Sequence, residues 1–438
     1  MAKNSAEVII SIILVAVTGL LLVVNRCISL SQVLNNNDSE YSWVNFALQN
    51  ILGYSTVFIP GYIVYKYIHK INYLDKAGNT CLAVVIRKCF EGEELIERSN
   101  VSCSNQPQPR TLLQDALLLL FYFVCLQISF LTWGVLQEKV MTQEYTNSSG
   151  EIGHFTDSQF LVFVNRILAF CLSGIVVMCT RQPRHKAPLC KYVFCSLSNI
   201  LSSWCQYEAL KYVSFPHQVL AKAAKTIPVM IMGKLISKTK YDYYEYIGAI
   251  ILSVGMLFFM LDTGNDRKGS TTVTTVSGVI LLCSYIAFDS FTSNWQGSLF
   301  KQYGMKPVQM MCGVNLFSCI FTAISLIQQG GFIKSLSFMV NFPTFIFDCL
   351  LISLCSAAGQ LFIYKTIASF GPLVFVIITT IRQGFSVLLS CIIYNHQVHT
   401  WGILGVLLVF FSIFLRIYCG YRLKVKRKRA QNVSDLKI

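Results

Sequence analysis

The sequence predicts an all-α polytopic membrane protein, and three observations carry that prediction. The chain of 438 residues is 54% hydrophobic and only 13% charged, with a mean hydropathy of +0.54, whereas a soluble domain is about 25% charged. It contains twelve apolar segments, and a helix needs ~20 such residues to cross a bilayer. Its 17 cysteines lie mostly inside those segments and form no Cys-x-x-Cys pair, so they resemble small hydrophobic residues more than metal ligands.

The apolar segments set the predicted order of the chain. The twelve predicted membrane helices lie near residues 8–24, 44–66, 112–136, 158–179, 189–210, 214–236, 243–262, 275–297, 307–328, 344–367, 372–394 and 399–420. The first is the weakest, because Lys3 precedes it and small or polar residues follow, and it is either a retained helix or a cleaved signal peptide. We expect an N-terminal helix pair (1–66), a cytosolic linker (67–110), two five-helix repeats (111–262 and 275–420) and a basic cytosolic tail (421–438).

Loop charges predict the orientation of these helices. If the C-terminal tail is cytosolic, the loops on its side carry roughly 20 Lys and Arg, against about 6 on the other side. The glycosylation sequons at Asn37 and Asn147 then fall in lumenal loops, while the sequon at Asn100 is cytosolic and stays unmodified. Orientation therefore accounts for the net charge of +15, and no nucleic-acid partner is expected.

The last ten predicted helices contain a weak internal repeat. The string from Tyr207 aligns with the string from Tyr364, an offset of 157 residues, and the same offset places Lys225 on Arg382. Each half holds five helices, and because five is odd, the second half must enter the membrane upside down. Inverted repeats are typical of transporters, whose substrate binds between the halves near the bilayer midplane. A chance match between two apolar stretches is the alternative.

Several cations lie inside the predicted membrane helices, where each costs at least ~2.5 kcal/mol unless it faces a partner or a polar cavity. Lys222 and Lys225 are three residues apart and therefore share one helix face. Arg166 and Arg382 lie well inside their segments, and Lys365 lies nearer a cytosolic end. Two like charges that close together favour an anion between or opposite them.

The acids inside the helices are fewer than the cations. Glu208 and Asp289 lie deep, and Glu245 lies near an end. Two interpretations follow: structural ion pairs, or an anion pocket that faces water from each side in turn. The second predicts a multiply charged substrate such as a nucleotide phosphate, because Arg binds phosphate in a bidentate manner and Lys acts as a point charge.

Three amides belong to the predicted site or its entrance. Asn315 interrupts an apolar segment and serves either as a helix–helix hydrogen bond or as a ligand contact. Asn294 and Gln296, with Asp289, make the end of their segment unusually polar. With Glu208, they line either a cytosolic cavity mouth or an ordinary interfacial belt.

Neither a catalytic residue nor a metal or cofactor site is predicted. The stretch 264–270 has the spacing of a phosphate loop but lacks the Lys after its second Gly, and His396 and His399 have no third ligand. A membrane-embedded transferase stays an alternative, because such enzymes can carry their acids in loops.

Longer strings resemble the nucleotide-sugar transporter family. They are 196–211, 218–234, 286–296 and 156–160, and the resemblance covers roughly residues 110–420. Within the family the strings are most similar to the branch that carries 3′-phosphoadenosine 5′-phosphosulfate (PAPS) into the Golgi. The resemblance implies the drug/metabolite transporter fold, a ten-helix core of two inverted five-helix repeats, here with one or two extra N-terminal helices.

The resemblance also implies an activity. Cytosolic PAPS would enter the Golgi lumen in exchange for an adenosine monophosphate or bisphosphate, and would supply sulfotransferases there. By position, Asn315 would read the base and Arg382 would hold the phosphates, and Tyr207 and Gln218 lie in the similar strings. The seventh core helix carries one Asn instead of the paired Asn of GDP-mannose relatives, and the ninth carries Arg-Gln instead of Arg-Lys.

The charge of PAPS suits the predicted pocket. PAPS carries about four negative charges, counting ~1.5–2 for its phosphate monoester, and the pocket offers Lys222, Lys225, Arg382 and Arg166. Another nucleotide sugar carried by the same fold is the alternative substrate. Membrane lipid is an expected partner, and a homodimer and an endoplasmic reticulum location are left open.

Overall fold

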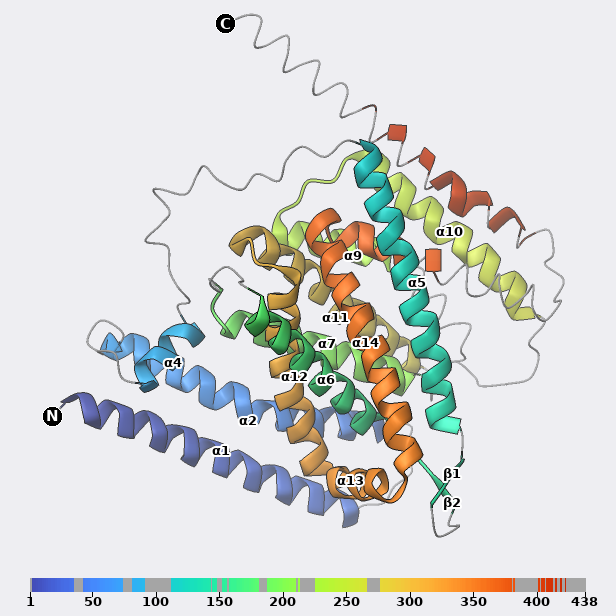
Figure 1. The fold of residues 1–438 in the computed structure, drawn as a ribbon. Coiled ribbons are helices and arrows are strands. Elements are labelled where there is room, and N and C mark those ends of the chain that lie inside the picture. The colour runs from blue at the N-terminus through green and yellow to red at the C-terminus, as the bar shows by residue number, and fades with distance from the viewer. Residues whose placement is uncertain are drawn as a thin grey trace, which may run out of the picture. The chain divides into compact units, whose positions relative to one another are not determined.

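The computed structural model describes most of the chain. The described residues are 2–34, 42–73, 81–90, 112–142, 144–147, 152–155, 157–180, 187–209, 212, 225–265, 276–379, 381–382, 401, 403–405, 407–412, 414–415, 418–419 and 422. The labelled elements (Figure 1) are α1 (Ala2–Leu34), α2 (Ser42–Ile71), α4 (Cys81–Phe90), α5 (Leu112–Thr142), β1 (Glu144–Thr146), β2 (Ile152–His154), α6 (Ser158–Cys179), α7 (Cys190–Ala209), α9 (Thr226–Ser237), α10 (Tyr243–Asn265), α11 (Val276–Tyr303), α12 (Pro307–Gln329), α13 (Gly331–Asn341) and α14 (Pro343–Phe370).

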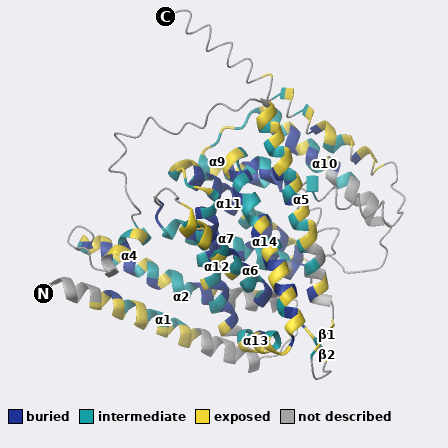
Figure 2. Ribbon diagram, viewed as in Figure 1, coloured by how far each residue is buried: buried dark blue, intermediate teal, exposed yellow. Residues whose placement is uncertain are grey.

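In the described part of the chain, five helices are long and apolar enough to cross a membrane, so the predicted class of an all-α membrane protein is confirmed. They are Leu113–Trp133, Gln159–Cys179, Val276–Tyr303, Pro307–Ile327 and Pro343–Phe370. The span of α12 is the most buried of the five and that of α5 the least, as Figure 2 shows. The predicted helices near 214–236, 372–394 and 399–420 fall partly outside the described residues.

The chain divides into two compact units that do not follow the two predicted halves. Unit 1 contains Met1–Ile200 and Leu299–Ala368, and unit 2 contains Leu201–Ser298 and Ser369–Ile438. Each predicted half therefore contributes helices to both units. In each unit, one pair of helices that have the same place in the two predicted halves packs together.

In unit 1 this pairing joins the second helix of each half. Helices α6 and α12 share the most extensive helix–helix contact of the described chain and lie side by side in Figure 1. Arg166 contacts Asn315, while Ser173, two turns further along α6, lies beside Cys312. The residue numbers rise along α6 as they fall along α12, so the two helices are antiparallel.

Unit 2 repeats the pattern with the fifth helix of each half. The Ser412 hydroxyl donates to the Gly248 carbonyl at 2.6 Å, and the Phe258 and Trp401 ring centroids are 5.7 Å apart. Here too, the numbers rise along α10 as they fall along 401–412. Antiparallel pairing of corresponding helices is what two oppositely inserted halves require, and the inverted repeat itself stays a prediction.

The N-terminal helices of unit 1 pack together. Ile10 of α1, Val64 and Ile68 of α2 and Ile86 of α4 form one buried apolar cluster. Helix α4 lies within the segment predicted to be a linker, so that segment is partly ordered against the helix pair. The aromatic ring of Phe58 in α2 stacks on Phe321 of α12, with centroids 5.6 Å apart.

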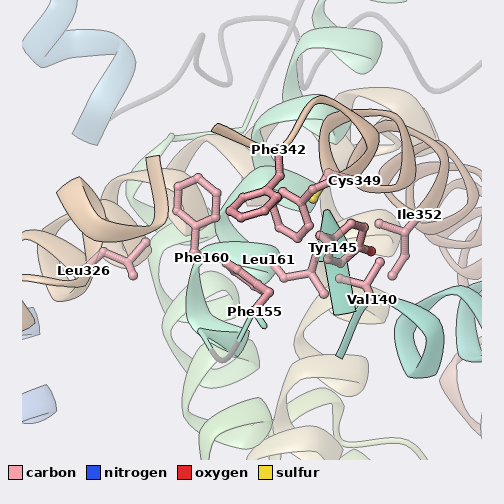
Figure 3. Packing of buried hydrophobic residues seen from close by; sticks show 10 residues of the cluster. Val140, Tyr145, Phe155, Phe160, Leu161, Leu326, Phe342, Cys349 and Ile352 are labelled. Carbon is pink, nitrogen blue, oxygen red and sulfur yellow. The ribbon is translucent and has the colours of Figure 1, made fainter. Parts of the chain in front are cut away.

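A β-hairpin and a short helix, neither of which was predicted, cover one end of unit 1. Strands β1 and β2 pair antiparallel in the loop predicted to be lumenal. Tyr145 of β1 packs edge-on against Phe345, with centroids 5.3 Å apart, and Phe155 lies 4.5 Å from Phe345. Figure 3 shows this aromatic cluster, which also includes Phe160 and Phe342.

Asp348 of α14 joins this helix to α5 by an ion pair and to the hairpin by a hydrogen bond. The buried Asp348 carboxylate accepts hydrogen bonds from Lys139 Nζ at 2.8 Å and from the Tyr145 hydroxyl at 3.1 Å. Burial, followed by the charge of Asp348, raises the pKa of Tyr145 well above its usual value. The phenol therefore stays protonated and keeps donating to the carboxylate.

The first turn of α6 shows why this helix begins where it does. The Asp157 side chain accepts hydrogen bonds from the backbone N–H groups of Gln159 and Phe160, which makes it an N-cap. Its second oxygen accepts from the Ser335 hydroxyl of α13 at 2.8 Å. One carboxylate thus starts the helix and anchors α13 beside it.

Candidate functional site

The strongest candidate for an anion site in unit 1 is centred on Arg166, in the middle of α6. Its Nη1 lies 3.5 Å from the Oδ1 of Asn315, which is fully buried in α12. The Asn315 amide donates to Gln360 Oε1 of α14 at 2.9 Å and to the Met311 carbonyl at 2.8 Å. These bonds orient the Asn315 oxygen toward the guanidinium, and three helices contribute to one polar cluster.

Arg166 has no protein counter-ion in the described part of the chain. No described carboxylate lies within 4.0 Å of the guanidinium. In unit 1, Asp348 is paired with Lys139 and Asp157 caps α6. A guanidinium at membrane depth that is met only by amide dipoles retains its capacity to bind a carboxylate, phosphate or sulfate.

Unit 2 holds a second cationic cluster, around Lys225. This residue immediately precedes α9, and its carbonyl already accepts the helical hydrogen bond from the Val229 N–H. Its ammonium forms an ion pair with Asp289, at the midpoint of α11, and lies 6.0 Å from the Phe375 ring centroid. Lys225 therefore has an acidic partner of the kind that the ion-pair interpretation expects, and its contact with a substrate stays a prediction.

Arg382 belongs to the same unit. It is partly buried and lies within electrostatic range of the Tyr285 hydroxyl, as does Asp289. Tyr285 thus interacts electrostatically with a cationic and an anionic side chain of unit 2.

The other predicted site residues have more local contacts. Lys365 lies over Phe362, one turn earlier in α14, at 5.6 Å from the ring centroid. Asn294 donates to the Val229 carbonyl and to the Ser290 carbonyl, both at 2.9 Å, and so braces α11 against α9. Glu208 and Gln296 are buried. Their predicted place at a cavity mouth stays a prediction.

Some predicted residues lie outside the described part of the chain. They are Asn37, Gln218, Lys222 and the side chain of Tyr207. The predicted sharing of one helix face by Lys222 and Lys225 therefore stays a prediction. Asn147 is described and directly follows β1.

Two polar contacts of the site were missed by the sequence analysis. Gln360 is a single amide within an apolar segment, and the rule that selected Asn315 would have selected it too. Asn165 accepts a hydrogen bond from the Ser353 hydroxyl at 2.7 Å, which joins α6 to α14 next to Arg166. In the described residues no group of three or more His, Cys, Asp or Glu side chains is placed to hold a metal.

Comparison with known proteins identifies the family. The model of the UAA transporter family matches residues 117–420. This chain belongs to the UAA transporter family. The match covers every helix from α6 to α14, and the expectation of a transporter, against that of a transferase, is confirmed.

Individual relatives of this UAA transporter cover nearly its whole length. A protein of Drosophila melanogaster named "Adenosine 3'-phospho 5'-phosphosulfate transporter 1" is 52% identical over 93% of this chain and 90% of its own length. The human protein of the same name is 49% identical over 90% of this chain and 91% of its own. A "UDP-galactose/UDP-glucose transporter 5" of Arabidopsis thaliana is 37% identical over 67% and 85%, respectively.

Proposed function

We propose that this UAA transporter is an antiporter that moves PAPS from the cytosol into the Golgi lumen in exchange for an adenosine monophosphate or bisphosphate. The observation that carries the proposal is the 52% identity, over 93% of the chain, to a relative named for PAPS transport. PAPS supplied in this way would serve lumenal sulfotransferases.

The charges of the two units support a substrate of this kind. Arg166 offers a guanidinium that no described carboxylate neutralises. In unit 2, Lys225 and Arg382 are cations, of which Lys225 pairs with Asp289. Partly or fully buried cationic side chains of this kind suit a solute with about four negative charges, such as PAPS, better than a neutral one.

The packing of the helices supports an alternating mechanism. Antiparallel contacts between α6 and α12, and between α10 and 401–412, are those of two halves inserted in opposite directions. In transporters built this way, the halves rock around a central site that opens to each side in turn. An exchange reaction follows if the loaded protein reorients faster than the empty one.

Reconstitution tests the proposal. The purified full chain is placed in liposomes, and uptake of labelled PAPS is compared between empty vesicles and vesicles preloaded with adenosine 3′,5′-bisphosphate. We expect preloading to accelerate uptake several-fold. If the rate of PAPS uptake is the same in empty and preloaded vesicles, the exchange mechanism is rejected. If UDP-galactose is taken up as fast as PAPS, the assigned substrate is rejected.

UDP-galactose is a second candidate because relatives that are 37% and 39% identical are named for UDP-galactose and UDP-glucose. These relatives cover a smaller part of the chain than the PAPS relatives do. Competition between unlabelled PAPS and UDP-galactose for uptake of either labelled compound distinguishes the two.

A further inference from the structure

The ion pair between Lys225 and Asp289 joins the residue before α9 to the midpoint of α11, inside unit 2. The Lys225 side chain is 10% exposed and the Asp289 side chain 27%, so the pair is mostly buried and the carboxylate is the more accessible partner. Within the described residues, neither side chain has another ion-pair partner.

The pair differs in this respect from Arg166, whose charge no described carboxylate meets. A lysine ammonium is a compact point charge and exchanges one oxyanion for another without a fixed geometry. A phosphate or sulfate group that reaches Lys225 competes with the Asp289 carboxylate, because two anions beside one ammonium repel each other. Ligand binding therefore weakens the Lys225–Asp289 contact.

We infer that Asp289 is an internal counter-ion of the substrate site, which pairs with Lys225 in the empty transporter and yields it to an anionic group of the substrate. This inference rests on the proposed transport function and adds a residue that sets affinity. The carboxylate stabilises the empty site, and its return to Lys225 assists release of the bound nucleotide. No covalent step is involved.

A thermodynamic cycle tests the exchange of partners. Asp289→Asn leaves Lys225 without its anion, so the empty variant melts at a lower temperature than wild type. A bound phosphate or sulfate replaces the missing carboxylate, so saturating substrate brings the two melting temperatures together. The same coupling makes the variant bind the substrate about tenfold more tightly, ~1.4 kcal/mol, and slows exchange because release is slower.

Asp348→Asn is the matched control. It removes a different described ion pair, Lys139–Asp348, from unit 1. Its loss of melting temperature is expected to be the same with and without substrate. Heat-induced aggregation measured in isolated membranes gives the same comparison if Asp289→Asn does not survive purification.

The outcomes separate the two proposals, because PAPS and UDP-galactose are both used as ligands. If the melting temperatures of Asp289→Asn and wild type differ by the same amount with and without saturating ligand, Asp289 is not a counter-ion of the substrate site, even if transport of PAPS is confirmed. A wild-type protein stabilised by UDP-galactose and not by PAPS overturns the substrate assignment, and the cycle is then read with UDP-galactose. A wild type that responds to neither overturns both.

Discussion

The guanidinium of Arg166 in α6 contacts the side-chain oxygen of Asn315 in α12, with 3.5 Å between Nη1 and Oδ1. The contact lies on the antiparallel pair of helices that occupy the same place in the two predicted halves of the chain. Asn315 is held by Gln360, so its oxygen presents a dipole and no charge to Arg166. The arrangement positions a cation without neutralising it, which is what an anion site requires.

Asn315→Asp tests whether the uncompensated charge matters. The substitution places a carboxylate about 3.5 Å from Arg166, and at an effective dielectric constant of ~20 such a pair attracts by about 4 kcal/mol. We expect the melting temperature to hold or rise while the KM for PAPS rises at least ~10-fold, ~1.4 kcal/mol. Asn341→Asp, which adds the same charge at an exposed position at the end of α13, is the control and should leave KM unchanged. An unchanged KM in Asn315→Asp would contradict the site.

Arg166→Gln removes the cation and keeps a hydrogen-bonding side chain. Hydrogen bonds to charged groups contribute about 1.5–3 kcal/mol, so we expect KM to rise by roughly 10- to 100-fold. Arg166→Lys keeps the charge but loses the bidentate geometry, and its effect should be intermediate. Lys301→Gln, an exposed charge at the end of α11, is the control and should transport normally. Equal KM values for Arg166→Gln and Lys301→Gln would exclude Arg166 from the site.

The sequence predicted the parts of this protein that depend on local composition. The five described spans match predicted segments within a few residues, because a bilayer demands a long apolar helix whatever the neighbours are. The cations Arg166, Lys225 and Arg382 were selected from their cost in an apolar segment. Hydropathy alone could not reveal the β1–β2 hairpin or α13, which are short and stabilised by contacts with α14 and α6.

Ion-pair partners on different helices could not be predicted from the sequence for a different reason. Asp289 was predicted as a deep acid and as part of a cavity mouth, but the sequence did not reveal its partner Lys225, 64 positions earlier in the chain (289 − 225). Such a pair depends on how α9 packs on α11, and that packing follows from features such as Gly233 that carry no charge signal. The number of buried charges is thus readable from one sequence, whereas their pairing is not.

Gly233→Ala tests the packing of α9 on α11. A Cβ at this position would lie 2.8 Å from the Asn294 Oδ1 and closer still to the Tyr241 hydroxyl. We expect overpacking to destabilise the protein by about 1–3 kcal/mol, seen as a lower melting temperature. Gly174→Ala is the matched control, since nothing lies within 4 Å of its Cβ, and in a helix interior it should be neutral or stabilising by up to ~1 kcal/mol. A Gly233→Ala variant as stable as Gly174→Ala would contradict the close packing.

Tyr145→Phe tests the contact between the hairpin and α14. The variant loses a hydrogen bond to a buried carboxylate and should be destabilised by about 1–3 kcal/mol. Tyr243→Phe, in which an exposed hydroxyl is removed, should have no effect. The melting temperatures of the two variants are compared with each other. Equal melting temperatures would show that the hydrogen bond from the hairpin does not contribute to stability.

The same contact predicts a pH dependence. Because the pKa of Tyr145 is raised in the folded protein, its contribution to stability is complete below the unfolded pKa of about 10 and declines as the pH rises beyond it. The stability difference between wild type and Tyr145→Phe should therefore be constant from pH 6 to 9, to within about 0.3 kcal/mol, and shrink at higher pH. A stability difference between wild type and Tyr145→Phe that grows above about pH 10 would contradict the raised pKa of Tyr145.

Glycosylation mapping tests the orientation of the whole chain. Asn147 follows β1, and if the hairpin is lumenal, its sequon is available to the glycosylation machinery, whereas the sequon at Asn100 is not. We expect a glycosidase to increase the gel mobility of the wild type, Asn147→Gln to remove part of that shift, and Asn100→Gln to leave it unchanged. Carbohydrate at Asn100 would invert the orientation and place the basic C-terminal tail in the lumen, against the excess of Lys and Arg in the loops on its side.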